Sequence, residues 1–301
     1  MSQHRPADSS TPTVPPVTKV AGPLGIIAGQ GPLPRVLAEQ AVAHGMPLHI
    51  VAIRGEAHDE VERFPHTWIK WGEIGKLFAA LENNGCQDLV IIGAVNRPDF
   101  GNVRLDIGAI KTLPFLLSLA KGGDDHVLSR VVRFFEEKGY RVHGAGDVAP
   151  ELLAQEGKLS AKVPSADDAS DIEAAFKVVR ALGQLDVGQG AVVARGRVLA
   201  VEAAEGTDAM LERCAELRKV GRTWGTRPAG VLVKAPKPGQ EERVDMPTIG
   251  PKTMRLAAAA GLSGIAMAAG HVLMAERDAT IKTANENKLF LVGERWDDAA
   301  T

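Results

Sequence analysis

Residues 24–37 read LGIIAGQGPLPRVL, and this stretch decides the class of fold. A run of apolar, strand-type residues leads into the Gly-Gln-Gly of residues 29–31, and a helical pattern follows. A strand, a glycine turn and a helix N-terminus are typical of α/β domains that bind phosphate. Pro32 and Pro34 stand where a dinucleotide fingerprint has its third glycine, and they remove two backbone donors. The loop is predicted to bind a phosphate group, and a plain tight turn is the open alternative.

Strand and helix patterns alternate from this stretch to about residue 150. Apolar strand runs occupy 47–55, 67–71 and 88–95, helical patterns fill the intervals and continue over 105–120 and 126–138, and residues 140–146 close the series. Continuous apolar runs separated by amphipathic helices indicate a parallel sheet that is covered on both faces. We predict a Rossmann-like N-terminal domain over residues 22–156.

The second half is predicted to form another α/β domain, over residues 169–301. Two β-branched runs flank Arg195-Gly196 as a hairpin, and a helix is expected to open at Pro251. Residues 1–21 are rich in Ser, Thr and Pro and are predicted to be a flexible tail, with 157–168 as a polar linker. The predicted fold is thus two α/β domains with a ligand cleft between them.

Composition excludes several classes of protein. A net charge of -2 gives no general attraction for nucleic acid. Cys86 and Cys214 lie far apart, without the spacing of a disulfide framework or a zinc site. The apolar stretch 256–275 is interrupted by Gly261, Gly264 and Gly270, so we predict a helix end, a turn and a buried strand rather than a membrane span. These features, with no apolar leader at the N-terminus, predict a cytoplasmic protein.

Polar groups follow the ends of the predicted strands in the first domain. Asn96, Arg97 and Pro98 come directly after the strand run 88–95, where open α/β sheets bind ligands, although Asn-Arg-Pro is also a common surface turn. Arg54 and Glu56 follow the second strand, roughly where dinucleotide enzymes read the ribose.

Carboxylates gather before two predicted helices. Asp124 and Asp125 in KGGDDH either cap a helix or serve a catalytic or metal site. Glu202, Glu205 and Asp208 lie within seven residues, and three carboxylates suit a hard cation such as magnesium, whereas Thr207 and Asp208 also suit a helix start.

A long loop over residues 235–250 is the last candidate. It carries Lys237, Arg243 and Asp245, follows Lys234 and ends at the helix start at Pro251. Long loops between regular elements are often functional. A carboxylate beside several cations stays ionised, so Asp245 is suited to bind a metal or orient a water, and a solvated loop with ordinary charges is the alternative.

Six stretches together resemble one family. GIIAGQGPLP, IIGAVNRP, KGGDDH, DVGQGAVV, EAAEGTDAML and RVDMPTIGP resemble, in order and in spacing, the UDP-2,3-diacylglucosamine pyrophosphatases of the LpxI type. The resemblance covers about residues 23–293. The one departure is Met246, where leucine is expected, and this change conserves side-chain volume.

The resemblance implies a magnesium-dependent hydrolase of lipid A biosynthesis. Water would split the pyrophosphate of UDP-2,3-diacylglucosamine into UMP and 2,3-diacylglucosamine 1-phosphate (lipid X). The enzyme would have two domains with the substrate between them and would form a homodimer. Transient contact with the inner membrane surface is a separate expectation, and the mode of access to the lipid stays open.

The resemblance assigns the catalytic residue, and the other roles are hypotheses from the stretches described above. Asp245 matches the catalytic aspartate, and Asp245, Glu205 and Asp208 are expected to bind the metal. The residues expected to bind the substrate are Gly29, Gln30, Gly31, Asn96, Arg97, Pro98, Asp124, Asp125, Gln189, Gly190, Gly206, Thr207, Lys234 and Thr248.

Two other classes of function stay open. A nicotinamide-dependent oxidoreductase would use the first domain, with Arg54 accepting a 2′-phosphate, and would give Asp245 no role. A non-catalytic carrier of a sugar nucleotide or lipid would bind the same substrate without turnover.

Overall fold

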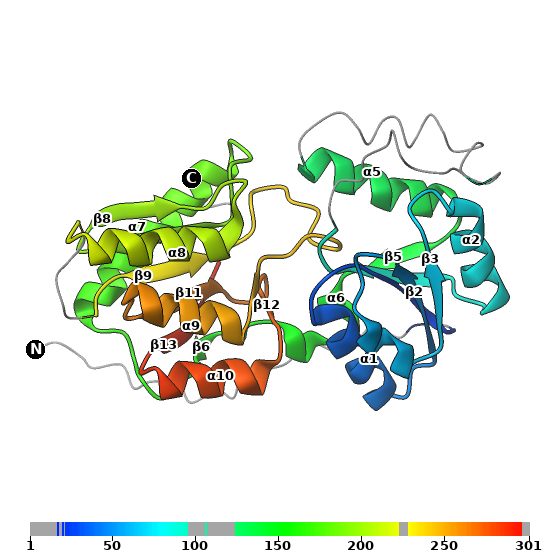
Figure 1. The fold of residues 1–301 in the computed structure, drawn as a ribbon, viewed down its shortest axis with the longest axis horizontal. Coiled ribbons are helices and arrows are strands. Elements are labelled where there is room, and N and C mark those ends of the chain that lie inside the picture. The colour runs from blue at the N-terminus through cyan, green and yellow to red at the C-terminus, as the bar shows by residue number, and fades with distance from the viewer. Residues whose placement is uncertain are drawn as a thin grey trace, which may run out of the picture.

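The computed structural model describes residues 17, 20, 22–95, 106, 124–222 and 228–296. Figure 1 shows two α/β domains side by side, with the N-terminal domain mainly in blue and cyan and the C-terminal domain in green to red. This is the predicted fold class.

The N-terminal domain is built on a five-stranded sheet. Its order is β3-β2-β1-β4-β5, and all neighbouring strands are parallel. The strands are β1 (Leu24–Ala28), β2 (Leu48–Ile53), β3 (His66–Ile69), β4 (Asp88–Ile92) and β5 (Arg141–His143). The parallel sheet predicted from the apolar runs is confirmed. Strand order reverses between β1 and β4, and ligands of open α/β sheets bind at such switch points.

Helices cover both faces of this sheet. They are α1 (Leu33–Ala43), α2 (Ile74–Asn83), α5 (Asp124–Glu137) and α6 (Ala145–Val148), with 3-10 turns η1 (Asp59–Arg63) and η2 (Pro150–Leu152). Side chains alternate along β1, because Leu24 and Ile26 pack in the core with α1 and α6, whereas Ile27 packs in the core with α2 and α5. Both faces are therefore buried, which explains the continuous apolar run.

The C-terminal domain has a six-stranded mixed sheet in the order β6-β13-β11-β9-β7-β8. The strands are β6 (Gly157–Lys158), β7 (Gly190–Ala194), β8 (Arg197–Val201), β9 (Val231–Lys234), β11 (Gly264–Ala268) and β13 (Phe290–Glu294). Strands β9, β11 and β13 are parallel, and the others are antiparallel to their neighbours. The predicted hairpin is confirmed, since Arg195 and Gly196 join β7 to β8 with φ of 53° and 73°.

The helices described in this domain are α7 (Ala166–Gly183), α8 (Gly206–Lys219), α9 (Pro251–Ala260) and α10 (Arg277–Glu286). Helix α7 packs on β7 and β9, whereas α8, α9 and α10 form a layer that contacts the sheet at β8, β11 and β13 (Figure 1). Ser165 caps α7 by accepting a hydrogen bond from the N–H of Asp168 at 3.2 Å. Helix α9 begins at Pro251, as predicted.

The segment 157–168, predicted as a linker, packs as part of the second domain. Its strand β6 pairs with the last strand, β13. Farther along, Lys162 Nζ donates to the carbonyl oxygen of Ser263 at 2.8 Å, and Ser160 Oγ donates to that of Leu289 at 3.1 Å. A two-residue strand has no visible periodicity, so the sequence pattern could not reveal this pairing.

The two domains are in contact. A small parallel sheet, β10 (Thr248–Ile249) with β12 (Leu273–Met274), lies in the second half of the chain. Leu273 and Ala275 nevertheless pack in the core formed by β1, α1 and α6 of the first domain. Arg35 of α1 also pairs with Glu276, which precedes α10, at 3.2 Å. The second domain therefore supplies part of the core of the first.

The apolar stretch 256–275 forms the end of α9, a turn at Gly261, strand β11 and strand β12. This confirms the predicted helix end, turn and buried strand. Within the described residues, no helix is both long enough and apolar enough to span a bilayer.

Candidate functional site

The glycine loop after β1 is bridged to the end of β4. Gln30 donates its backbone N–H to the carbonyl oxygen of Ala94 at 2.7 Å, and its side-chain amide donates to Glu56 Oε2 at 2.5 Å. Gln30 therefore uses its backbone N–H and one N–H of its side-chain amide within the protein itself. Glu56, a candidate for reading a ribose, is buried against it.

The two glycines of the loop have different structural roles. A Cβ on Gly29 would lie 2.5 Å from the carbonyl oxygen of Ala94 and 2.7 Å from that of Gly93. Gly31 has a φ of 86° and open space around its Cβ position. At Gly29, the group that approaches closely is thus the backbone of residues 93 and 94 rather than a ligand. Gly31 is the glycine that borders open space.

We expect Gly29→Ala to lower the free energy of unfolding by about 3 kcal/mol, because rigid backbone atoms must move to admit the methyl group. Gly31→Ala should cost about 1 kcal/mol, because only the positive φ is unfavourable there. Thermal denaturation of both variants measures the difference. Equal losses at the two positions would show that the contact with the end of β4 does not set the requirement for glycine at Gly29.

Two groups of predicted residues are not placed. Asn96, Arg97 and Pro98 lie outside the described residues. Asp124 and Asp125 begin α5, but their side chains also lie outside the description. Their assignment to the substrate stays a prediction.

A buried charged cluster lies at the carboxyl end of β9. Lys234 Nζ donates to Glu202 Oε2 at 2.8 Å and to Thr207 Oγ1 at 2.7 Å, and Thr207 in turn donates to Glu202 Oε1 at 2.9 Å. The side chain of Lys234 is 4% exposed and that of Glu202 is 12% exposed. The structure therefore brings together Lys234 and Thr207, both predicted, with Glu202.

Glycine is required beside this cluster. Gly190, at the start of β7, pairs with Lys234, and a Cβ on it would lie 2.5 Å from Glu202 Oε2. Gly206, at the start of α8, has a φ of 77° and open space around its Cβ position. Both predicted glycines thus border the cluster, Gly190 through close packing and Gly206 through the turn into Thr207.

Asp245 lies next to this cluster in the fold. Its carboxylate Oδ2 accepts from the side-chain amide of Gln240 at 2.6 Å and from that of Gln189 at 3.3 Å. Gln189 precedes Gly190, and its carbonyl oxygen accepts from the N–H of Ala235 at 3.1 Å. Gln189 therefore connects Asp245 to the strand ends that carry the charged cluster.

The residues that flank Asp245 pack on the N-terminal domain. Val244 packs in the core with α2 and α5, and Met246 packs in the core with α1 and α6. Figure 1 shows this loop, in yellow to orange, reaching from the C-terminal domain toward the N-terminal one. Asp245 is thus held where the two domains meet.

An ion-pair chain ties the loop to α5. Arg243 pairs with Glu136 at 2.7 Å and with Glu241 at 2.7 Å. Hydrogen bonds to Glu241 and Glu136 raise the pKa of Arg243, and the bond from Arg243 lowers the pKa of Glu241. Arg243 and Glu241 therefore stay charged, and this chain of ion pairs fixes the loop on the first domain.

The three carboxylates predicted to bind a metal are not assembled. Glu205 pairs with Arg213 at 2.9 Å, and Asp208 pairs with Lys252 at 2.8 Å. Across residues 22–95, 127–222 and 228–296, no group of three His, Cys, Asp or Glu side chains is placed to hold a metal ion. A cage made of Glu205, Asp208 and Asp245 does not fit this geometry.

Thr248 and the cysteines complete the predicted residues. Thr248 begins β10, and its hydroxyl donates to the carbonyl oxygen of Met246 at 3.2 Å. Burial raises the pKa of the Cys214 thiol to about 11 and also raises that of Cys86. Neither cysteine therefore suits a nucleophile at neutral pH, in keeping with water as the attacking group.

Sequence reasoning did not select Gln240, and it considered Glu202 only as one of three carboxylates suited to a hard cation. Gln240 bonds Asp245, and Glu202 holds Lys234. Glu202 follows the end of β8, and Lys234 ends β9. The two residues come together because β7 pairs antiparallel with both of these strands, and the sequence does not show its pairing with β9. Nothing in the sequence distinguishes Gln240 from other polar loop residues.

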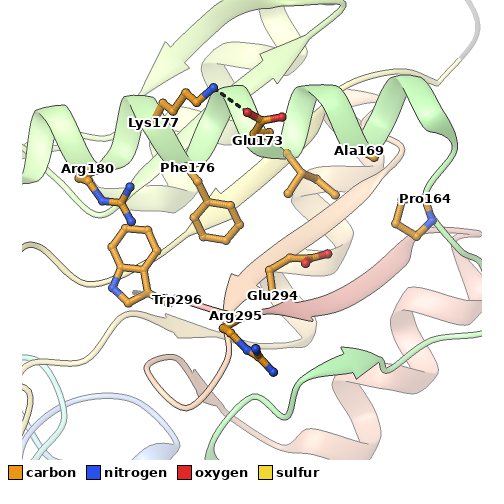
Figure 2. Close-up of a pocket in the computed structure, with 10 residues that line it drawn as sticks. Pro164, Ala169, Glu173, Phe176, Lys177, Arg180, Glu294, Arg295 and Trp296 are labelled. Carbon is orange, nitrogen blue, oxygen red and sulfur yellow. Dashed lines mark hydrogen bonds and ion pairs between the residues drawn. The ribbon is translucent and has the colours of Figure 1, made fainter. Parts of the chain in front are cut away.

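A hollow of about 350 Å³ lies away from these residues, between α7 and the end of β13. Figure 2 shows Phe176, Arg180 and Trp296 together on its wall, with Arg180 over the indole ring at 4.6 Å from the ring centroid. None of the predicted site residues lines it.

Comparison with known proteins covers both domains. A model of the LpxI N-terminal domain matches residues 23–152, and a model of the LpxI C-terminal domain matches residues 155–292. A protein of Caulobacter vibrioides named UDP-2,3-diacylglucosamine pyrophosphatase LpxI is 45% identical over 270 residues. The aligned region is 90% of this chain and 96% of that protein.

Proposed function

The chain belongs to the LpxI family over both of its domains, and we infer that it hydrolyses the pyrophosphate bond of UDP-2,3-diacylglucosamine in lipid A biosynthesis. The products are UMP and 2,3-diacylglucosamine 1-phosphate. The extent of the match supports this activity, because 96% of the relative aligns and both domains that contribute to the site are present.

The geometry around Asp245 supports a catalytic role for this carboxylate. Two side-chain amides hold Oδ2, and the flanking residues pack on the other domain. A substrate bound between the domains would meet a carboxylate whose position is fixed before binding. Such fixed groups act on a reacting phosphorus without reorganisation. We assign Asp245 to the orientation of the attacking water.

Lys234 is proposed to attract the diphosphate of the substrate. Its ammonium group lies at the carboxyl end of β9, the edge at which α/β sheets bind ligands, and Glu202 and Thr207 fix its direction. A buried cation near a dianionic diphosphate stabilises the charge that moves to the leaving phosphate. Gly31 and Gln189 are proposed to contact the uridine diphosphate portion.

Mg²⁺ is part of the proposal. Since the three predicted carboxylates are not assembled, we propose that the ion is held mainly by pyrophosphate oxygens, with Asp245 as its carboxylate ligand. Mg²⁺ commonly binds through one or two carboxylates together with substrate phosphates and water. A bound Mg²⁺ would neutralise charge on the pyrophosphate.

One assay tests the activity and its metal requirement. Protein incubated with UDP-2,3-diacylglucosamine and Mg²⁺ is expected to release UMP, and EDTA is expected to reduce the rate by at least about 100-fold, with recovery on added Mg²⁺. Chromatography of the nucleotide products measures both. Absence of UMP, with intact substrate recovered bound to the protein, would instead support the carrier, and tight NADPH binding would support the oxidoreductase.

The homodimer and the location also belong to the proposal. A substrate with two acyl chains resides in a membrane, so we propose a cytoplasmic enzyme that makes transient contact with the inner membrane surface. Light scattering reports the oligomeric state, and flotation with lipid vesicles reports the contact.

A further inference from the structure

The side-chain amide of Gln240 is fully used on one loop. Its Nε2 donates to the backbone carbonyl oxygen of Asp245 at 2.9 Å and to Asp245 Oδ2 at 2.6 Å. Its Oε1 accepts from the backbone N–H of Lys237 at 2.8 Å. A primary amide has two N–H donors, so both are spent on Asp245.

Gln240 is itself held rigidly. It is 9% exposed, and its own N–H donates to the carbonyl oxygen of Lys237 at 3.1 Å. Lys237 is buried and pairs with Asp186, just beyond α7, at 2.6 Å. The amide therefore lies on a segment anchored to the body of the C-terminal domain.

Two contacts from one amide fix a side chain more closely than one. The bond to the carbonyl oxygen of Asp245 fixes the backbone at that residue, and the bond to Oδ2 fixes the rotation of its carboxylate. Gln189 adds a second donor to the same oxygen from the strand side. Two hydrogen bonds thus hold Oδ2 of the carboxylate, and a third holds the backbone of the same residue.

We propose that Gln240 is the positioning residue of Asp245, holding its carboxylate in the orientation that hydrolysis of the pyrophosphate requires. This role rests on the proposed function of Asp245. Gln240 has two separable tasks, since Oε1 holds the loop through Lys237 and Nε2 holds the carboxylate.

Gln240→Glu separates these tasks. Glutamate has the same shape and keeps the acceptor for the Lys237 N–H, but it cannot donate to Asp245 when ionised. We expect kcat for UDP-2,3-diacylglucosamine to fall about 100-fold at neutral pH, with KM changed less than about threefold. The loss should shrink as the pH falls, because the introduced carboxyl group, once protonated, donates to Asp245 again. The melting temperature should stay within a few degrees of the wild type.

Two further variants serve as controls. Gln184→Glu makes the same chemical change at the exposed end of α7 and should leave kcat unchanged at every pH. Gln240→Met removes both tasks, so it should lose kcat to the same degree as Gln240→Glu and should also melt at lower temperature. A Gln240→Glu enzyme with kcat within threefold of wild type, or with a loss independent of pH, would overturn the proposal.

A measurement without substrate distinguishes this proposal from the proposed function. In protein labelled with ¹³C at aspartate carboxyl carbons, the Asp245 signal is identified by its absence in Asp245→Asn. At neutral pH we expect the chemical shift of this signal to differ between Gln240→Glu and the wild type, because a second carboxylate replaces the amide donor to Oδ2. An unchanged chemical shift would refute the positioning role even if the wild type released no UMP, which by itself would refute only the proposed function.

Discussion

Asp245→Asn is expected to lower kcat/KM for UDP-2,3-diacylglucosamine by about 10³-fold while the protein stays folded. The substitution preserves the shape of the side chain and removes its charge. Its oxygen can still accept from Gln240 and Gln189, so the loop keeps its contacts. Release of UMP measures the activity, and the melting temperature reports the fold.

Asp59→Asn is the matched control, because Asp59 is exposed in the short turn η1. Its activity should equal that of the wild type. An Asp245→Asn enzyme that keeps a tenth or more of the wild-type kcat/KM would remove Asp245 from the proposed mechanism.

Lys234→Met is expected to have the largest effect on stability, together with a strong effect on activity. The substitution leaves the carboxylate of Glu202 buried without its cation, and loss of one partner of a buried pair costs about 3 kcal/mol or more. The loss of a cation beside the diphosphate should lower kcat/KM about 100-fold as well. Denaturation and UMP release measure the two effects separately.

The double variant Glu202→Gln with Lys234→Met distinguishes the two effects. It removes the unpaired buried charge of Glu202, so most of the lost free energy of unfolding should be recovered, whereas kcat/KM should stay low. Lys177→Met is a surface control, because Lys177 and Glu173 are 71% and 72% exposed, and this change should cost less than about 1 kcal/mol. Recovery of activity in the double variant would show that Lys234 serves the fold alone.

The sequence predicted those parts of the fold whose signal is local. Strands β1, β2 and β4 of the first sheet are mainly apolar runs. The hairpin at Arg195 and the helix start at Pro251 depend on neighbouring residues. The two-residue strands β6, β10 and β12 were not predicted, because each is defined by a partner far along the chain. The packing of Leu273 in the first domain is likewise a contact between distant segments.

The candidate site was predicted in part for the same reason. Asp245 and Thr207 stand in stretches that resemble the family, and Lys234 was selected because it precedes the long loop 235–250. The structure places Lys234 and Thr207 in one cluster. The need for glycine at Gly29 was predicted, but its cause was not, since the neighbouring backbone at Ala94 comes from another strand. The ion pairs of Glu205 and Asp208 also depend on cations that only the folded chain brings near.

The loop that carries Asp245 has a consequence for the order of folding. It starts in one domain, and Val244, Met246 and the Arg243–Glu136 pair attach it to the other. Each domain can form its own sheet before this attachment exists, because domains generally fold as units and dock afterwards. During refolding, secondary structure should therefore recover before hydrolysis does. The rate at which activity returns then measures the rate at which the two domains dock. Spectroscopic signals from either sheet would not detect this step.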